Sequence, residues 1–417
     1  MFTVVKKFTP AFIVEYCRPP YHFLLSLLGA VYYGFPSKKI IVVGVTGTKG
    51  KSSTTEILGN IFEAAGHKTA VLGTIKFKIG DKTERNLTKM TMPGRFFIQK
   101  FLRDALNAGC THAVIEMSSE GAKQYRQRFI DMDALIFLNL SPEHIDAHGS
   151  YERYRDAKLS IAHTLSRSTK SERFLIGNKD DIECVRFFVV PRIIPVPFSI
   201  TDAEELVVDD THIKFLFHGK EIASMLGGKF NVMNMLAAGT CAMKLGVPLP
   251  AIALGIARTT KIEGRIEHIE AGQSFPVIVD YAHTPDSLEA LYDTFTKYET
   301  VCVLGNTGGG RDKWKRPVMG ALAEKYCTDV ILTNEDPYDE NPLEIIGDIA
   351  HGMEYKHPII ILDRREAIAH ALSLARAKKG RVAVLITGKG TDPYIMGAGG
   401  TKVPWDDRRV AEEELGK

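Results

Sequence analysis

The sequence lacks the features that mark secreted or nucleic-acid-binding proteins. Its formal net charge is only +3 over 417 residues, so it has no basic excess of the kind that binds nucleic acid. Its few cysteines show neither paired spacing nor a C-x-x-C motif, and several stand in apolar runs where cysteine acts as a small buried hydrophobe. They are Cys17, Cys110, Cys184, Cys241, Cys302 and Cys327. This usage favours a reducing cytoplasm, and no nucleic-acid partner is expected.

A run of apolar residues long enough to cross a membrane is also missing. The stretch YHFLLSLLGAVYYGF (21–35) is shorter than the ~20 residues that span a bilayer, and it contains His22, Ser26 and Gly29. No small-residue cleavage site follows it, so a signal peptide is not expected. We expect a helix packed on the body of the protein. A peripheral membrane or protein contact through residues 21–35, or a true anchor, is the alternative.

Internal repeats and low-complexity linkers are absent, and the chain is too long for one ordinary core. Before residue 260, strand-like runs alternate with helix-like segments; the strands are expected at 39–45, 69–75, 112–117 and 133–138, and the helices at 53–65, 95–108, 151–165 and 231–246. Residues 171–228, which include FFVVP and HIKFLFHG, are interpreted as strands on the edge of this domain. After Gly264 the alternation restarts, with strands expected at 276–280, 300–304, 329–333, 358–362 and 382–386.

This alternation predicts an α/β protein with parallel strands and helical crossovers. We expect a short N-terminal segment (1–38), a central domain (39–263) with a doubly wound, mostly parallel sheet, and a second, Rossmann-like α/β domain (264–417). Ligands of such sheets bind at the carboxyl ends of the strands.

A glycine-rich segment, VVGVTGTKGKSSTTEIL (42–58), joins a valine-rich run to an apolar, helix-like stretch. Its glycines allow close approach to the backbone, whose successive amides can cradle a phosphate at the N-terminus of the following helix. Lys51 would contact the β- and γ-phosphates and Ser52 would bind Mg²⁺. Val45 stands where the strict G-x-x-x-x-G-K-[ST] pattern has its first glycine. The strand before and the helix after still predict a phosphate loop in a P-loop domain, rather than a turn that binds nothing.

Three further polar residues lie at predictable distances after expected strands. Glu116 ends the run HAVIE, His144 lies in a turn-rich segment, and Lys158 lies on the helix expected at 151–165. Each alone could be a solvated acid, a core histidine or a surface lysine. Together they suggest a site for two cations beside the phosphate loop.

Several segments together resemble the Mur ligase family, and most closely its muramyl-tripeptide synthetase branch (MurE type). They occur in the family order from about residue 39 to the C-terminus: GVTGTKGKSST, EMSSEG, NLSPEHIDAHGSYERYRDAK, GGKFNVMNMLAA, EGRIEHIEAGQSFPVIVDYAHTPDSLE, RDKWKRPVMG, TNEDPYDENP and GKGTD. The segments VDYAHTPDSLE and RDKWKRP are the most specific of these.

The resemblance implies an ATP-dependent, ADP-forming ligase that joins a carboxylate to an amine through an acyl phosphate, in peptidoglycan precursor synthesis. It implies that Lys51 and Ser52 hold the triphosphate and a first Mg²⁺, with Glu116 as a further metal ligand. His144 resembles the ligand of a second Mg²⁺. Lys158 aligns with a lysine that is carbamylated in many relatives, which would make it an anion able to help hold that second ion.

The resemblance also implies the residues that bind nucleotide and substrates. The nucleotide contacts are Gly47, Thr48, Gly50, Lys51, Ser52 and Ser53 in the loop, Asn234 for adenine, and Arg265, Asp280 and His283 in the C-terminal block. The contacts with a muramyl dipeptide nucleotide are Thr91, Met92, Pro93, Ser118, Ser119 and Arg126. Candidates for phosphate or the incoming amino acid are Arg311, Lys315, Asp336, Tyr338, Gly388 and Asp392.

Two departures from the branch pattern concern the substrates. Residues 1–38 are too few for the branch's uridine-nucleotide domain, so the short apolar segment and the central domain hold that moiety, or the substrate lacks it. The stretch EDPY (335–338) replaces the D-N-P-R of members that use diaminopimelate. Loss of that arginine favours lysine, ornithine or another diamino acid, whose distal ammonium could approach Asp336 or Asp392. Arg311 could compensate, which keeps diaminopimelate open.

The leading prediction is therefore a cytoplasmic amino-acid ligase acting on UDP-N-acetylmuramoyl-L-alanyl-D-glutamate. A related ligase on another carboxylate, folylpolyglutamate synthetase-like or modifying lipid-linked muropeptides, is the first alternative. A non-catalytic nucleotide-binding scaffold docked through residues 21–35 is the second.

Overall fold

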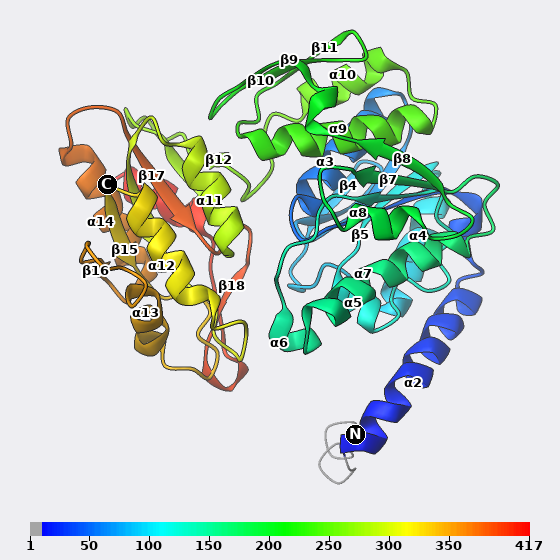
Figure 1. Ribbon diagram of the computed structural model, residues 1–417, viewed down its shortest axis with the longest axis horizontal. Helices are drawn as coiled ribbons and strands as arrows, with labels where there is room; N and C mark the ends of the chain where they lie inside the picture. The colour runs from blue at the N-terminus through cyan, green and yellow to red at the C-terminus, as the bar shows by residue number, and fades with distance from the viewer. Residues whose placement is uncertain (1–10) are drawn as a thin grey trace. The chain divides into compact units, whose positions relative to one another are not determined.

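The computed structural model describes residues 11–417, which divide into two compact units (Figure 1). Of the described residues, the first unit comprises 11–141, Glu152–Ala203 and Met233–Ile256. The second comprises Pro142–Tyr151, Glu204–Val232 and Ala257–Lys417. Each unit is built around its own open α/β sheet, and they are described separately below.

The first unit begins with helix α2 (Ala11–Tyr32), followed by the 3₁₀ turn η1 (Pro36–Lys39). Ser26 Oγ donates a hydrogen bond to the Tyr125 carbonyl at 2.8 Å, and the rings of Phe23 and Phe129 meet edge to face with centroids 5.2 Å apart. The expected helix packed on the body is therefore confirmed. Among residues 11–417, no helix is long and apolar enough to cross a membrane.

An eight-stranded sheet forms the core of the first unit, in the order β4-β3-β2-β5-β1-β6-β7-β8. Its strands are β1 (Ile41–Thr46), β2 (Thr69–Leu72), β3 (Lys76–Ile79), β4 (Lys82–Arg85), β5 (His112–Glu116), β6 (Ala134–Phe137), β7 (Phe174–Asn178) and β8 (Ile194–Phe198). All neighbours are parallel except the pairs made by β3. The apolar runs are buried on both faces, as parallel strands covered by helices require.

Helices connect these strands and cover the sheet. They are α3 (Lys51–Ala64), α4 (Arg95–Asn107), α5 (Ser119–Lys123), α7 (Tyr151–Ser166), α8 (Cys184–Phe188), α9 (Lys229–Lys244) and α10 (Leu249–Arg258), with the 3₁₀ turn η2 (Ile200–Asp202). Gly255 on α10 lies directly against Ile61 on α3, where a Cβ would come within 2.3 Å of the Ile61 Cα. The short helix α6 (Ile145–His148) belongs to the second unit.

Residues 171–228 match the expectation in part, because β7 and β8 lie at the edge of the large sheet. Two details are wrong. FFVVP is not a strand: Phe187 ends up in α8, because its ring stacks on Phe137 with centroids 4.0 Å apart and both rings are buried. The three strands after β8 do not belong to the large sheet. β9 (Glu204–Val208), β10 (Ile213–Phe217) and β11 (Lys220–Ser224) form a separate antiparallel sheet in the order β11-β10-β9, because HIKFLFHG turns back on itself at Gly219.

The second unit contains a six-stranded sheet in the order β12-β13-β17-β14-β15-β16. Its strands are β12 (Glu267–His268), β13 (Val277–Asp280), β14 (Glu299–Leu304), β15 (Asp329–Leu332), β16 (Ile359–Ile360) and β17 (Val382–Thr387), and only β12 is antiparallel to its neighbour. Helices α11 (Pro285–Thr294), α12 (Lys315–Tyr326) and α13 (Pro342–Ala350) share a buried cluster on one face. Helices α14 (Arg364–Ala377) and α15 (Asp407–Leu415) share another on the opposite face.

A small hairpin completes this unit, made by β18 (Tyr394–Met396) and β19 (Lys402–Pro404) around η3 (Ala398–Gly400). The predicted fold class, a doubly wound central sheet followed by a Rossmann-like α/β sheet, is confirmed. The predicted domain limits at residues 38 and 263 stay a prediction.

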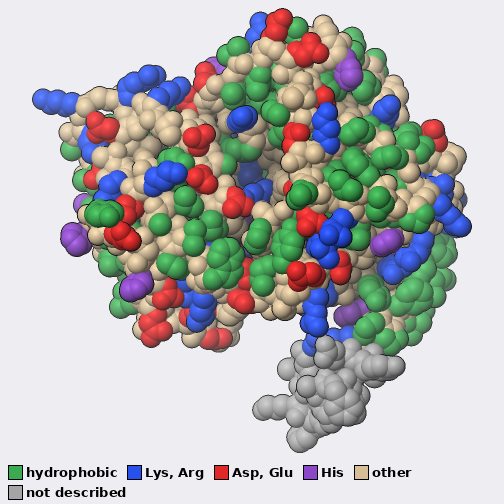
Figure 2. Space-filling model, viewed as in Figure 1, with side chains coloured by type: hydrophobic (Ala, Val, Ile, Leu, Met, Phe, Trp, Pro, Cys, Tyr) green, Lys and Arg blue, Asp and Glu red, His purple; other side chains and the backbone are tan. Residues whose placement is uncertain are grey.

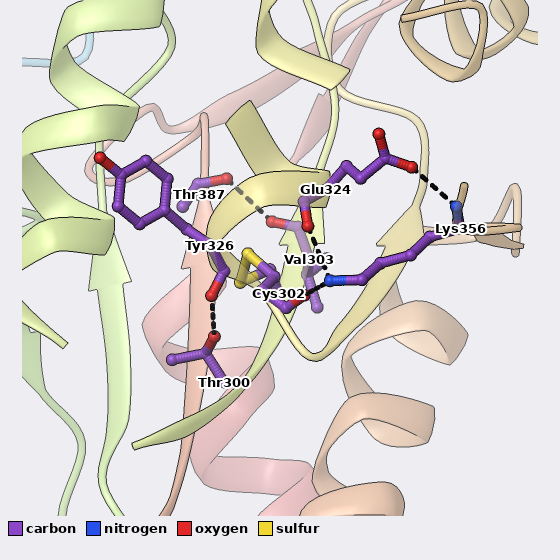
Figure 3. The surroundings of a disulfide bond; sticks show 8 residues. Thr300, Cys302, Val303, Glu324, Tyr326, Lys356 and Thr387 are labelled. Carbon is purple, nitrogen blue, oxygen red and sulfur yellow. Dashed lines mark hydrogen bonds between the residues drawn. A yellow bond between two sulfur atoms is a disulfide. The ribbon is translucent and has the colours of Figure 1, made fainter. Parts of the chain in front are cut away.

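The cysteines differ from expectation at one pair. Cys302 on β14 and Cys327 after α12 form a disulfide (Figure 3), beside the hydrogen bond from Thr300 Oγ1 to the Tyr326 carbonyl. Their separation of 25 residues gives no signal, because the pairing depends on where α12 ends over the sheet. The small buried hydrophobes that we expected are found at Cys110, Cys184 and Cys241. The side chain of Cys17 lies outside the described residues.

Candidate active site

The phosphate loop joins β1, which ends at Thr46, to α3, which begins at Lys51. The loop therefore lies at the carboxyl end of the strand that stands between β5 and β6. Gly50 has φ +80°, and a Cβ there would lie 2.3 Å from Asn234 Oδ1. Both the backbone conformation and the space thus require glycine. The predicted strand, loop and helix are confirmed.

Polar groups hold the loop in shape. Lys51 Nζ donates to the carbonyls of Gly47 at 3.1 Å and Thr48 at 2.8 Å. The amides of Thr48 and Lys49 both donate to Asn139 Oδ1, at 3.0 and 2.9 Å. Asn139 follows β6, the neighbour of β1, so the order of the strands explains its contact with the loop.

A carboxylate and a hydroxyl lie together at the start of α3. Ser52 Oγ is 3.2 Å from both carboxylate oxygens of Glu116, a residue 1% exposed at the end of β5. Thr74 fixes that carboxylate, its amide donating to Oε2 at 2.8 Å and its hydroxyl to Oε1 at 3.0 Å. One hydroxyl and one carboxylate beside a phosphate loop fit Mg²⁺, which takes its other ligands from phosphate and water. Among residues 11–417, no group of three or more His, Cys, Asp or Glu side chains could hold a metal by itself.

Helix α7 carries Lys158 to the same loop. Its side chain is buried, and Nζ donates to the Gly47 carbonyl at 2.6 Å and lies 4.9 Å from the centre of the Tyr154 ring. The Tyr154 hydroxyl is in turn 2.9 Å from Thr48 Oγ1. The nucleotide residues predicted in the first unit therefore lie around one loop, with Ser53 buried in the first turn of α3.

Asn234 also belongs to this group. Its Oδ1 accepts a hydrogen bond from Thr54 Oγ1 at 3.3 Å, and the side chain is buried. Its predicted contact with adenine stays a prediction.

The predicted acceptor residues lie near Glu116 in the same unit. Thr91 Oγ1 is 2.8 Å from Thr74 Oγ1, so it is one hydrogen bond removed from the Glu116 carboxylate. Arg126 donates to the Met92 carbonyl and, at 2.8 Å, to Gln124 Oε1. Burial, and secondarily the charge of Arg95, lowers the pKa of the Arg126 guanidinium.

The remaining acceptor residues shape the backbone of this region. Ser118 caps α5 by accepting a hydrogen bond from the Gly121 amide at 3.2 Å, and Ser119 is buried in its first turn. Gly121 packs against Met92, whose sulfur would be 2.3 Å from a Cβ placed there. Pro93 ends the TMP segment next to Gly94, which precedes α4. The structure thus brings the six predicted acceptor residues into one region.

The segment that carries His144 packs within the second unit. His144 has φ +56°, and Glu143 lies 3.8 Å from His144 Nε2 and 3.2 Å from His283 Nε2. The amides of Ile145 and Asp146 donate to the Asp312 carboxylate, at 3.4 and 3.0 Å. His144 and Lys158, predicted as ligands of one ion, therefore belong to different units.

Asp280 and Arg265 lie at the end of β13. Asp280 is buried, and its oxygens accept hydrogen bonds from the amides of Ile266 and Ala282, both at 2.7 Å. Burial raises the pKa of Asp280, and the Arg265 charge opposes this. The Arg265 guanidinium lies 4.5 Å from the centre of the Tyr281 ring. Their expected contacts with phosphate and ribose stay predictions.

Two basic residues come from the segment RDKWKRP. Lys315 Nζ donates to the His283 carbonyl at 3.0 Å, and burial lowers its pKa against the opposing charge of Glu143. Arg311 lies 6.0 Å from the centre of the Tyr338 ring. Burial alone would lower the pKa of the Arg311 guanidinium. Its interactions with Tyr281, Tyr338, Asp336 and Asp392 outweigh burial and raise that pKa.

A buried ion cluster lies where β15 and β17 end. Lys389 is fully buried, and its Nζ is 2.8 Å from Asp336 Oδ1 and 3.3 Å from Asp392 Oδ2. Gly388 has φ +103°, and a Cβ there would lie 2.3 Å from Glu335 Oε2. That oxygen is buried without a hydrogen-bond partner among the described residues.

Four residues that contact the predicted site residues were not themselves predicted from the sequence: Asn139, Thr74, Glu143 and Lys389. Glu143 and Lys389 stand inside the quoted segments, so their positions were visible but their contacts were not. Asn139 and Thr74 follow strands that flank β1 and β5, so only the strand order could have singled them out.

Comparison with known proteins identifies the family of this chain. A family model for the Mur ligase middle domain matches residues 45–242, and one for the Mur ligase, glutamate ligase domain, matches residues 264–390. The chain is 35% identical over 405 residues to the UDP-N-acetylmuramoyl-L-alanyl-D-glutamate--2,6-diaminopimelate ligase of Bacillus cereus, over 94% of this chain and 81% of that protein. It is 35% identical over 419 residues to the UDP-N-acetylmuramyl-tripeptide synthetase of a Roseiflexus species, with the same two shares.

A solved structure of a UDP-N-acetylmuramoyl-L-alanyl-D-glutamate--2,6-diaminopimelate ligase matches with a TM-score of 0.60 and 28% identity. The match covers 90% of this chain and 78% of that one. Both domain matches and both relatives agree with the predicted family and with the predicted enzyme class. The chain belongs to the Mur ligase family of ATP-dependent, ADP-forming ligases.

Proposed function

We propose that the protein joins a diamino acid to the D-glutamyl carboxylate of UDP-N-acetylmuramoyl-L-alanyl-D-glutamate, with cleavage of ATP to ADP and phosphate. One observation carries this proposal. The Ser52 and Glu116 pair beside the phosphate loop is joined through Thr74 to Thr91, in the region that also holds Arg126. Residues suited to a triphosphate and residues suited to an acidic acceptor thus lie in one unit. The names of the two relatives supply the acceptor and the kind of amine.

The chemistry has two steps that these residues can serve. An oxygen of the acceptor carboxylate bonds to the γ-phosphorus as the bond to the β-phosphate oxygen breaks, which gives ADP and an acyl phosphate. The amine nitrogen then bonds to the acyl carbon, phosphate leaves, and the nitrogen loses a proton. The obstacle in the first step is repulsion between two anions, which positive groups held in place relieve.

The chain's own groups meet this requirement at the loop. The N-terminus of α3 would face the phosphates, and Lys51 would add a positive charge. Arg126 can hold an acceptor carboxylate with its planar fork. Mg²⁺ held by Ser52 and Glu116 would supply charge neutralisation between carboxylate and phosphate.

Lys158 is the proposed site of carbamylation. Its neutral amine would add to carbon dioxide and lose a proton, which converts a cation into a carboxylate. Burial beside Gly47 of the phosphate loop supports this role, since an anion there could help hold a second Mg²⁺ next to the triphosphate.

The charges at the ends of β15 and β17 support a diamino acid. Asp336 and Asp392 provide two carboxylates. Lys389 forms ion pairs with both, and the charge of Arg311 interacts with both. Such a mixture suits a bound end that carries both an ammonium and a carboxylate, as diaminopimelate has at each end. Tyr338 stands where diaminopimelate-using members carry arginine, so Arg311 is the proposed carboxylate partner.

An ADP-release assay tests the proposal. Purified protein receives Mg²⁺, ATP, UDP-N-acetylmuramoyl-L-alanyl-D-glutamate and, in parallel, meso-diaminopimelate, lysine or ornithine, and mass spectrometry detects the new amide. We expect ADP and amide in equal amounts with one diamino acid, and neither from a Glu116→Gln variant. ADP release without any amide, or with every amine alike, would contradict the proposal.

A further inference from the structure

The outward face of α2 is apolar along the length whose side chains are described. Tyr21, Leu24, Leu28 and Val31 follow one another at intervals of three and four residues, so they lie on one side of the helix. They are 43%, 54%, 47% and 56% exposed. A surface helix of a globular protein ordinarily turns polar side chains outward. The outward face of α2 therefore needs an explanation other than folding of this unit.

The opposite face of α2 already makes the contacts with the body. Ala30 is fully buried, Ser26 bonds to the Tyr125 carbonyl, and Gly29 lies against Phe96 of α4, which would be 3.6 Å from a Cβ there. Small residues on this side let the helix approach α4 closely. The apolar outward side is thus a second face, in addition to the one that docks the helix.

The apolar surface continues beyond α2. Tyr32 is 76% exposed, and its ring centre lies 6.5 Å from that of Phe96, itself 40% exposed on α4. We call Tyr21, Leu24, Leu28, Val31, Tyr32 and Phe96 the α2 patch. Figure 2 shows hydrophobic side chains gathered where α2 runs. A contiguous patch of this kind on a soluble unit marks an interaction site.

The sequence that contains the α2 patch has a net positive charge. The first forty residues contain Lys6, Lys7, Arg18, Lys38 and Lys39 but a single acid, Glu15, a net of +4 in a chain whose total is +3. No Asp or Glu occurs between Glu15 and Glu56. Arg18 at one end of the described patch and Lys38 and Lys39 past the other are exposed. A partner that covers the patch must therefore present negative charge next to an apolar phase.

We propose that the α2 patch is a docking surface for an anionic lipid bilayer, with α2 lying in the plane of the interface. An apolar stripe of Leu, Val and Tyr flanked by Lys and Arg is the composition of helices that bind membranes in this way. Tyrosines at both ends of the stripe suit the headgroup level. Since no helix among residues 11–417 could cross a bilayer, α2 lies on it and does not span it.

The α2 patch is linked to the predicted acceptor region inside the first unit. Ser26 bonds to the carbonyl of Tyr125, and the next residue, Arg126, bonds to Met92 of the TMP segment. His22 on the same helix lies 2.5 Å from an Arg95 nitrogen at the start of α4. Docking would hold the acceptor region near the lipid surface. The proposal rests on α2 and its surroundings and is independent of the substrates proposed above.

Vesicle flotation tests the proposal with the full chain. Vesicles of phosphatidylcholine alone and of equal parts phosphatidylcholine and phosphatidylglycerol are compared. We expect the wild-type protein to float with the anionic vesicles, and salt to weaken binding. The triple variant Leu24→Glu, Leu28→Glu, Val31→Glu should lose at least about tenfold in vesicle affinity. It places three negative charges on the apolar stripe and leaves the inner face of α2 unchanged. The pair Lys38→Glu, Lys39→Glu should also lose binding, which tests the charge separately.

The matched control carries the same change on another exposed apolar surface of the first unit. The variant Ile182→Glu, Val185→Glu, Val189→Glu alters residues that are 64% to 88% exposed around α8, and it should float like the wild type. Circular dichroism and thermal unfolding establish that all variants fold. Equal flotation of the α2 triple variant and wild type, or no flotation of wild type with anionic vesicles, would overturn the proposal. So would a wild-type dimer in lipid-free solution that the α2 triple variant dissociates, since a second copy would then cover the patch.

Discussion

At the scale of single residues, Gly50 offers a sharp test of the phosphate loop. Gly50 and Gly66 have nearly the same φ, +80° and +85°, but a Cβ at Gly50 meets Asn234 whereas one at Gly66 meets nothing within 4 Å. Gly50→Ala and Gly66→Ala should therefore share a backbone cost of about 1 kcal/mol. Only Gly50→Ala should weaken ATP binding, by about tenfold or more, because it displaces the loop amides. Calorimetric titration with ATP measures this, and equal affinities in the two variants would contradict the assigned loop.

Lys158 is the second residue whose role can be isolated. Lys158→Ala should lower turnover by about a hundredfold or more while the protein stays folded, because it removes the proposed carbamate beside the triphosphate. Acetate or another short carboxylic acid should restore part of the activity by occupying the vacated space.

Lys244→Ala provides the control, since Lys244 is an exposed lysine in the last turn of α9. Its turnover should match the wild type, with no response to acetate. A Lys158→Ala variant that keeps full activity would refute the role proposed for this residue.

The position of a candidate site residue could be predicted where a sequence motif fixed it, but not where contacts between distant segments fixed it. Glu116 was foreseen at a strand end next to the loop, because β5 is parallel to β1 and the two strands end together. Thr74, which orients Glu116, carried no signal, since its role depends on β2 lying beside β5. Lys389 was visible in GKGTD, but its ion cluster arises only because β15 and β17 end close together in space.

At the scale of elements, ring packing at the start of β5 predicts a dependence of stability on pH. The His112 ring lies 4.5 Å from that of Phe62 on α3 and 4.1 Å from that of His67. Burial, with a smaller contribution from His67, lowers the pKa of His112 to about 4. As the pH falls below the ordinary value of 6.5, the unfolded chain binds this proton before the folded chain does. The free energy of unfolding should therefore decrease between about pH 6.5 and pH 4.

Urea unfolding followed by circular dichroism at pH 7 and pH 5 measures this change. His112→Phe keeps an aromatic ring among Phe62 and His67 and removes the titrating group, so its loss of stability over this range should be smaller. Identical losses in the variant and the wild type would show that His112 does not contribute.

The disulfide between β14 and the end of α12 gives a prediction for the second unit. Closing a loop of 25 residues stabilises the folded state by about 3.5 kcal/mol in the chain-entropy description. Reduction, or Cys302→Ser with Cys327→Ser, should lower the unfolding free energy of this unit accordingly. Thiol titration of the denatured protein should find two more thiols after reduction than before. Equal thiol counts would contradict the bond.

The elements themselves were largely predictable, because apolar runs of strand length alternate with helix-length segments. The exception, FFVVP, shows the limit of that pattern. Its composition favours a strand, but Phe187 gains a buried stack on Phe137 when the segment is helical. Such packing depends on which strand lies underneath, and a short apolar run cannot report that.

At the scale of the whole molecule, the family segments occur in order over most of the chain, so the two-unit α/β architecture and the family could be predicted together. How the candidate site residues divide between the units was not foreseen. His144 and its neighbours in Pro142–Tyr151 belong to the second unit, whereas Lys158, fourteen residues later, belongs to the first. Dividing the sequence into contiguous domains cannot show that a segment of the second unit interrupts the sequence of the first.

In the proposed reaction, this chain forms the amide through an acyl phosphate. Transfer of oxygen isotope tests it directly: the acceptor is supplied with ¹⁸O in its reacting carboxylate, together with ATP, Mg²⁺ and the diamino acid, and the released phosphate is analysed by mass spectrometry. Each released phosphate should carry one labelled oxygen, because the carboxylate oxygen that attacks the γ-phosphorus leaves with it. Amide formation with unlabelled phosphate would show that no acyl phosphate forms.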